Sequence, residues 1–232
     1  MATVASPPPQ AQPAAGPAAR PNWVQRNHFI LRRLHSLTGI VPIGGFLLFH
    51  FYENAAIFYG AEAYNEMSVD ARSIRFIEGI ELLVVFLPLL YHAIYGLFIA
   101  GYARNNTMTY NYSRNNLFMW QRATGIIILL FLMYHIWHFR LTQFWFGEAN
   151  SFSVMTTLAY IPTLIFYIIG VVASAFHLGN GIWTFLITWG ITIGQRAQRI
   201  SQIVTTSLSI IISLLGIAIA LAFVQMAGGP HF

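Results

Sequence analysis

The chain has 232 residues, of which 56% are hydrophobic and only 8% charged, and its mean hydropathy is +0.60, whereas a soluble domain carries about 25% charged residues. This composition excludes an ordinary soluble protein and indicates an integral membrane protein; the absence of cysteine further excludes disulfides, thiolate metal sites, cysteine-ligated clusters and c-type haem attachment in this chain. The net charge of +5 arises from twelve arginines and seven acids, and their distribution fits membrane topology better than nucleic-acid binding.

The first 27 residues are expected to form a disordered tail. Residues 1–21 are rich in proline and alanine and lack the basic and apolar regions of a signal peptide. Residues 28–232 are expected to form one transmembrane domain.

Five segments are apolar and long enough to cross a membrane, which takes about 20 residues. They are roughly residues 34–59, 74–103, 117–146, 156–193 and 203–227. Splitting the long fourth segment at "LGNG" would leave only about a dozen apolar residues for another crossing. The predicted fold is therefore an all-α bundle of five transmembrane helices, the fourth of them bent at these glycines.

Arginine distribution predicts the orientation of the bundle. In a five-helix arrangement nine arginines lie on one side, and only Arg72, Arg75 and Arg140 lie on the other. The positive-inside rule makes the first side cytoplasmic. The N-terminus is thus expected inside and the C-terminus outside a multi-pass inner membrane protein.

An internal repeat relates the first span to the third. "RLHSLTGI" (33–40) and "WQRATGII" (120–127) each contain Thr-Gly, followed 11 or 10 residues after the glycine by His50 or His135. His92 and His177 each have a glycine four residues later, and both histidine pairs are 42 apart, so they repeat at 85. Two helical hairpins of the same orientation are expected, with equivalent histidines at equal depth on opposite sides of the axis.

Helix geometry separates the histidines by depth. At 1.5 Å per residue, His135 lies about 16 Å beyond Thr124 and His50 about 18 Å beyond Thr38, in the outer half of a core ~30 Å thick. His177 falls near the inner face, and the repeat assigns His92 to the same level. We expect an outer site of His50 and His135 and an inner site of His92 and His177.

An ionisable group inside a span suggests a functional site. A single such histidine is more often a packing residue, but four at a repeated spacing favour metal ligation. Two histidines leave zinc short of its usual four ligands, whereas haem supplies four of its own, and bis-histidine haem suits electron transfer. The sequence thus predicts two b haems.

Arginines and hydrogen-bond donors near the inner face are candidate contacts for the haem propionates. They are His35, Ser36, Arg33, Trp120, Arg122 and Arg196. Membrane topology explains the arginines equally well.

Several stretches together resemble a known family, the cytochrome b membrane anchor of succinate:quinone oxidoreductases, of the single-polypeptide, five-helix, dihaem kind. They are "RRLHSLTG", "GAEAYN", "FLPLLYHAIYG", "RNNLFMWQRATGI", "FHLGNGIWTFLITWGIT" and "RAQRIS". They extend over nearly all of the chain after residue 30, while the N-terminal tail lies outside the resemblance.

The resemblance implies axial ligation at the same four histidines. It implies a proximal haem (His92, His177) near a cytoplasmic iron–sulfur subunit and a distal haem (His50, His135) near an outer site for menaquinone. The chain has no flavin fold and no clusters, so it would act with a flavoprotein subunit and an iron–sulfur subunit, in a complex that could form a higher oligomer. Some fumarate reductases of the family carry a glutamate where this chain has Ala175, which favours succinate oxidation over fumarate reduction.

Other interpretations remain open from the sequence. The chain could be the dihaem gamma subunit of a formate dehydrogenase or nitrate reductase, or a proton-coupled transporter with a histidine relay. A quinol-oxidising cytochrome b fits less well, because its paired ligands lie on one helix at a shorter spacing than that of His35 and His50, the nearest such pair here. Glu53 and Glu81 are candidate proton acceptors at the outer helix ends. His138 has no repeat counterpart and is expected at the interface.

Overall fold

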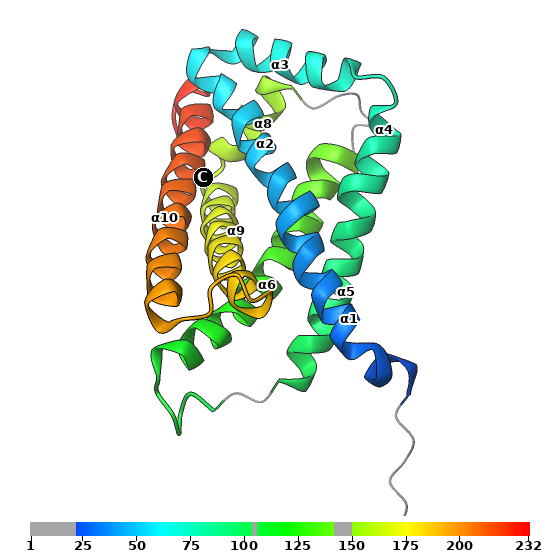
Figure 1. Ribbon diagram of the computed structural model, residues 1–232. Helices are drawn as coiled ribbons and strands as arrows, with labels where there is room; N and C mark the ends of the chain where they lie inside the picture. The colour runs from blue at the N-terminus through cyan, green and yellow to red at the C-terminus, as the bar shows by residue number, and fades with distance from the viewer. Residues whose placement is uncertain (1–21, 104–105, 142–149) are drawn as a thin grey trace, which may run out of the picture.

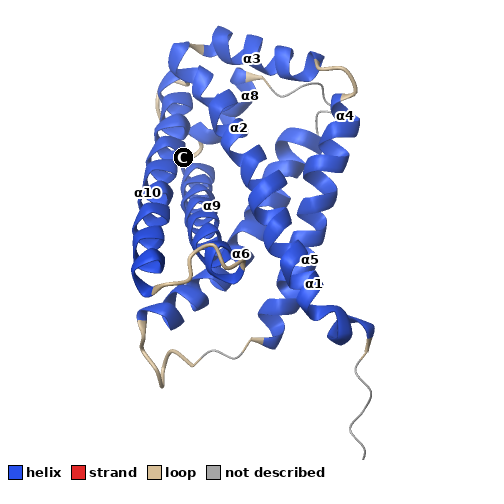
Figure 2. Cartoon of the chain, in the orientation of Figure 1, coloured by secondary structure: helices blue, strands red, loops and turns tan. Residues whose placement is uncertain are grey.

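The computed structural model describes residues 22–103, 106–141 and 150–232. Apart from one isolated bridge between Tyr160 and His231, the regular structure in these ranges is helical (Figure 2). Five of the helical segments are long and apolar enough to cross a membrane. The prediction of an all-α, five-helix membrane protein is confirmed.

The first span consists of four consecutive helical pieces. They are α1 (Trp23–Thr38), the π-helix η1 (Gly39–Ile43), α2 (Gly44–Ala55) and the 3₁₀-helix η2 (Ala56–Tyr59). Asn22 and Gln25 form a capping box, so the helix starts within the predicted tail; residues 1–21 lie outside the described ranges. Pro42 lies in η1, where the wider turn accommodates a residue that lacks an N–H group.

The second and third spans also contain π-helical turns. After α3 (Ala61–Ser73), the second span comprises α4 (Ile77–Ile80), η3 (Glu81–Phe86) and α5 (Leu87–Tyr102). The third comprises α6 (Ser113–Ile136) and η4 (Trp137–Leu141). Its predicted end at residue 146 lies outside the described residues.

The fourth span is one helix, as predicted. The short helix α8 (Ser151–Ala159) precedes α9 (Ile161–Thr188), which passes through "LGNG" as a single helical element and ends five residues earlier than expected. The fifth span, α10 (Gln195–Met226), begins eight residues before the predicted start. We call the end with the starts of α1, α6 and α10 the inner end, and the opposite one the outer end.

Helices α9 and α10 contain much of the buried core. They pack extensively on each other, and α9 also packs on α6. Small residues allow this close approach: Gly179 of α9 packs against Ser209 and the Thr205 carbonyl of α10. Helix α3 lies across the outer end, at the top of Figure 1. Residues of α1, α2, α5, α6 and α9 line a large cavity in this bundle.

Candidate cofactor-binding site

A cavity of 2110 Å³ extends between the two ends of the bundle. Its lining includes Arg33 and Arg122 near the inner end and Glu81 and Arg140 near the outer end. Most of the wall is aliphatic or aromatic. A pocket for a single small ligand has about 300–1,000 Å³, so this cavity is large enough for two bulky groups.

All four repeated histidines line this cavity, from four different helices. The ring centroids of His50 (α2) and His135 (α6) are 5.7 Å apart, with ring planes at 81°. Those of His92 (α5) and His177 (α9) are 6.2 Å apart, with ring planes at 79°. The structure therefore brings the histidines together in the two predicted pairs.

These separations fit axial ligation of one metal by each pair. Metal–nitrogen bonds to histidine are about 2.0–2.1 Å long, so two imidazoles that bind one ion from opposite sides have ring centres roughly 6 Å apart. Within the described residues, no three histidine or acidic side chains form a cluster that could hold a metal ion. An ion held by either pair alone would lack ligands, which a macrocycle such as haem supplies.

Hydrogen bonds to backbone carbonyls orient the inner pair. His92 Nδ1 lies 2.9 Å from the carbonyl oxygen of His35, and His177 Nδ1 lies 3.0 Å from that of Gln121. A carbonyl only accepts, so in each ring Nδ1 must be the donor and Nε2 keeps its lone pair. This is the arrangement by which proteins orient a histidine that binds metal.

A glycine faces each of these two imidazoles. A Cβ atom on Gly39 would lie 2.5 Å from His92 Cε1, and one on Gly125 would lie 3.2 Å from His177 Cε1. In both halves of the chain the accepting carbonyl precedes this glycine by four residues. The Thr-Gly repeat thus marks, in each half of the chain, a site where a backbone carbonyl orients the histidine and a glycine leaves room for its ring.

The π-helix η1 explains why the repeat spacing is 11 residues in the first span and 10 in the third. One extra residue in a regular α-helix would rotate His50 by about 100° relative to Gly39. A π-turn absorbs one additional residue, and η1 contains the corresponding bond from the Gly44 N–H to the Gly39 carbonyl. The α-helix α6 extends from Gly125 to His135 without such a turn. Both outer histidines consequently face the cavity.

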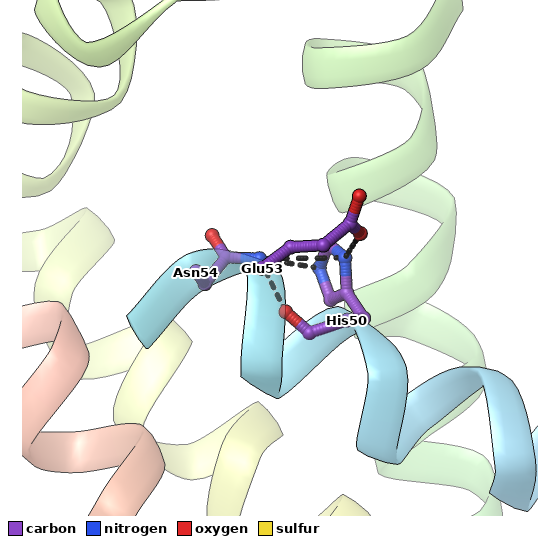
Figure 3. A network of polar contacts seen from close by, with 3 residues as sticks. All are labelled: His50, Glu53 and Asn54. Atoms are coloured by element: carbon purple, nitrogen blue, oxygen red, sulfur yellow. Dashed lines mark hydrogen bonds and ion pairs between the residues drawn. The ribbon is translucent and has the colours of Figure 1, made fainter. Parts of the chain in front are cut away.

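The outer pair has side-chain neighbours instead of carbonyl acceptors. Asn54 donates to the His50 carbonyl at 2.7 Å and lies 3.4 Å from both ring nitrogens, while Glu53 Oε2 lies 3.9 Å from His50 Nδ1 (Figure 3). His135 Nδ1 lies 3.2 Å from the Tyr167 hydroxyl. The outer imidazoles are therefore held by groups that can themselves rotate.

Charged and polar residues from several elements surround the outer end of the cavity. Arg140 and Glu81 form an ion pair, with nitrogen–oxygen distances of 2.5 and 3.1 Å. Tyr64, Ser68 and Arg72 of α3 line the same region. Burial raises the pKa of Tyr64 above its usual range, which keeps its phenol protonated. Of the two candidate proton acceptors, Glu53 lies beside His50 and Glu81 is paired with Arg140.

His138 lies away from the cavity wall. Its Nε2 is 3.0 Å from Thr157 Oγ1 of α8, and its ring stacks on Tyr134 with centroids 5.4 Å apart. It connects η4 to α8, a structural contact that the sequence did not predict.

Four of the six candidate propionate contacts line the cavity near its inner end: Arg33, His35, Ser36 and Arg122. The His35 ring stacks on that of His92 with centroids 4.0 Å apart. Trp120 is half exposed, and neither it nor Arg196 is among the described lining residues. Arg32 and Arg114 also line this end. The sequence did not identify them as propionate contacts, because membrane topology explains single arginines there equally well.

Comparison with known proteins adds one relative. No model of a protein family matches the chain. The chain is 44% identical over 197 residues to the succinate dehydrogenase cytochrome b558 subunit of Bacillus subtilis (strain 168). The match covers 84% of this chain and 97% of that protein.

Proposed function

The chain belongs to the cytochrome b membrane-anchor subunits of succinate dehydrogenases, and we propose that it conducts electrons through two b haems, each held by two of its histidines. Family membership implies haem b, a multi-pass membrane location and a complex with other subunits. It favours this role over a formate dehydrogenase or nitrate reductase subunit and over a transporter.

The paired histidines in one cavity are the observation that supports two haems. His92 and His177 would hold an inner haem, and His50 and His135 an outer one. Haem supplies one-electron redox chemistry when bound. The chain contributes the ligands, the carbonyls that keep the Nδ1 protons of His92 and His177 in place, and a largely apolar wall around both sites.

The inner end suits an iron–sulfur subunit as the electron donor. This chain has no cysteine for clusters, so an iron–sulfur subunit and a flavoprotein subunit must supply them and the succinate site. Arg33, His35, Ser36 and Arg122 would stabilise the propionates of the inner haem by charge-assisted hydrogen bonds.

The outer end suits a quinone as the electron acceptor. We propose menaquinone, bound under α3 beside the outer histidine pair, and succinate oxidation as the working direction. Ala175 is fully buried in a cluster with Leu178 and Ile212, so an apolar contact occupies the position where some fumarate reductases of the family have a glutamate.

Haem content of the purified complex tests this function. The complex should contain flavoprotein and iron–sulfur subunits and two haems per copy of this chain. His177→Ala should remove the inner haem and leave the outer spectrum, and His135→Ala should do the reverse. His138→Ala is the matched control, because its ring lies outside the cavity, and it should retain both. If the His92→Ala and His177→Ala variants both retained two haems, the assignment of these histidines as ligands of the inner haem would be wrong.

A further inference from the structure

A buried amide pair connects α6 to α9 next to the inner histidines. Asn180 is only 8% exposed, and its side-chain amide donates to Gln121 Oε1 at 2.7 Å. The Gln121 amide in turn donates to the His177 carbonyl at 3.1 Å. Gln121 and Asn180 both line the cavity, and neither is one of the repeated histidines or the candidate propionate contacts.

Gln121 contacts His177 through two separate bonds. The Gln121 carbonyl accepts from the His177 imidazole at 3.0 Å, and the Gln121 side chain donates to the His177 carbonyl. One residue of α6 therefore holds both the ring and the backbone of the same histidine. Asn180, one turn further along α9, keeps the Gln121 side chain in the orientation that this second bond requires.

The other half of the inner site lacks this arrangement. The repeat places His35 at the position equivalent to Gln121, and Tyr95 at the position equivalent to Asn180. The His35 carbonyl accepts from His92 in the same way, but the His35 ring stacks on His92. The Tyr95 hydroxyl lies 2.8 Å from His28 Nδ1 instead. Ligand, carbonyl and glycine thus follow the repeat, while the amide pair belongs to His177 alone.

We propose that Gln121 and Asn180 are positioning residues that fix the ring plane of His177 and strengthen its Nδ1–H bond, and thereby lower the reduction potential of the inner haem. This inference rests on the proposed function. A firmly held Nδ1–H donor makes the imidazole a more basic ligand, and a more basic axial ligand favours the oxidised iron.

The test is a redox titration of both haems, with low-temperature EPR spectra, in the purified complex. Gln121→Met preserves the backbone carbonyl and most of the side-chain volume but removes the amide. Asn180→Leu leaves Gln121 without its partner. Both variants should retain two haems, raise the inner midpoint potential and change the inner EPR signal, with Asn180→Leu giving the smaller shift. The outer haem should be unaffected.

Thr157→Val provides the matched control, because it removes a side-chain bond between two helices at the outer end. It should leave the inner haem unchanged. Loss of the inner haem in Gln121→Met would overturn the inference, because the amide would then be needed for haem binding and not for setting the potential. If both variants kept two haems with unchanged inner potential and EPR signal, the inference would be overturned and the proposed function would be unaffected. Equal changes at both haems would also overturn it, because they would show that the amide pair acts only through general helix packing. Absence of haem from the unaltered complex would instead contradict the proposed function.

Discussion

Gly39 and Gly125 occupy equivalent positions in the repeat, but they leave different amounts of space. A Cβ atom would lie 2.5 Å from His92 at the first and 3.2 Å from His177 at the second. The first distance requires the imidazole to move, and an overpacked site typically loses about 1–3 kcal/mol. At the second, a displacement of a few tenths of an ångström would relieve the contact.

We therefore predict that Gly39→Ala lowers the inner haem content markedly, while Gly125→Ala retains the haem with a small spectral change. Haem content per polypeptide and reduced-minus-oxidised spectra measure both effects. Gly101→Ala is the control, because a Cβ atom there meets nothing within 4 Å. Equal haem retention in all three variants would show that the inner imidazole has more freedom than the structure indicates.

At the level of residues, the sequence predicted the four candidate ligands because their spacing repeats. It did not predict Gln121 or Asn180, because a polar amide inside an apolar helix has no characteristic spacing and its partner lies on another span. It also could not separate cavity-lining arginines from those of ordinary topology, since both lie at the same helix ends.

At the level of elements, the π-helix η1 keeps the outer histidine in register with its partner. Pro42 helps to fix the location of this turn, because proline in a regular α-helix would clash with the carbonyl four residues before it. The extra residue is therefore confined to Gly39–Ile43 and does not shift along the helix.

Single deletions test this register. Deleting Pro42 should convert η1 to an ordinary α-helical turn with the ten-residue spacing of α6, so both haems should remain. Deleting Leu48, a half-exposed residue between η1 and His50, retains Pro42 and its π-turn and should rotate His50 away from the cavity. We expect loss of the outer haem alone in the second variant, measured by redox difference spectra. The opposite pattern would show that η1 does not set the register.

Helix ends were harder to predict than helix locations. The apolar runs indicated all five spans, but α10 starts at Gln195 and α1 at Trp23, in polar sequence that hydropathy assigns to water. Helices can extend beyond the hydrocarbon core, and in α1 the Asn22 capping box specifies the start. The short helix α3 was not predicted, because it is too short to span a membrane, and the predicted fourth span covered only the last residues of α8 (Ser151–Ala159).

At the level of the whole molecule, the two histidine pairs lie at different depths in a cavity that connects the ends of the bundle. His92 lies in the inner half of the second span (Ile77–Tyr102) and His177 in the inner half of α9, whereas His50 and His135 lie in the outer halves of α2 and α6. An electron that passes between the two sites would therefore move along the membrane normal, and the direction of this movement depends on which end faces the cytoplasm.

The orientation itself is the last prediction. Five crossings place the termini on opposite sides of the membrane, and the starts of α1, α6 and α10 bring most of the described arginines to one end, which the positive-inside rule places in the cytoplasm. A reporter that is active only after export should work when fused after Phe232 and fail when fused before Met1. A reporter that fluoresces only in the cytoplasm should show the reverse, and the short segment before Ser113 should behave like the N-terminus. A cytoplasmic C-terminus would place His92 and His177 far from a cytoplasmic donor, and the proposed electron path would then have to begin at His50 and His135.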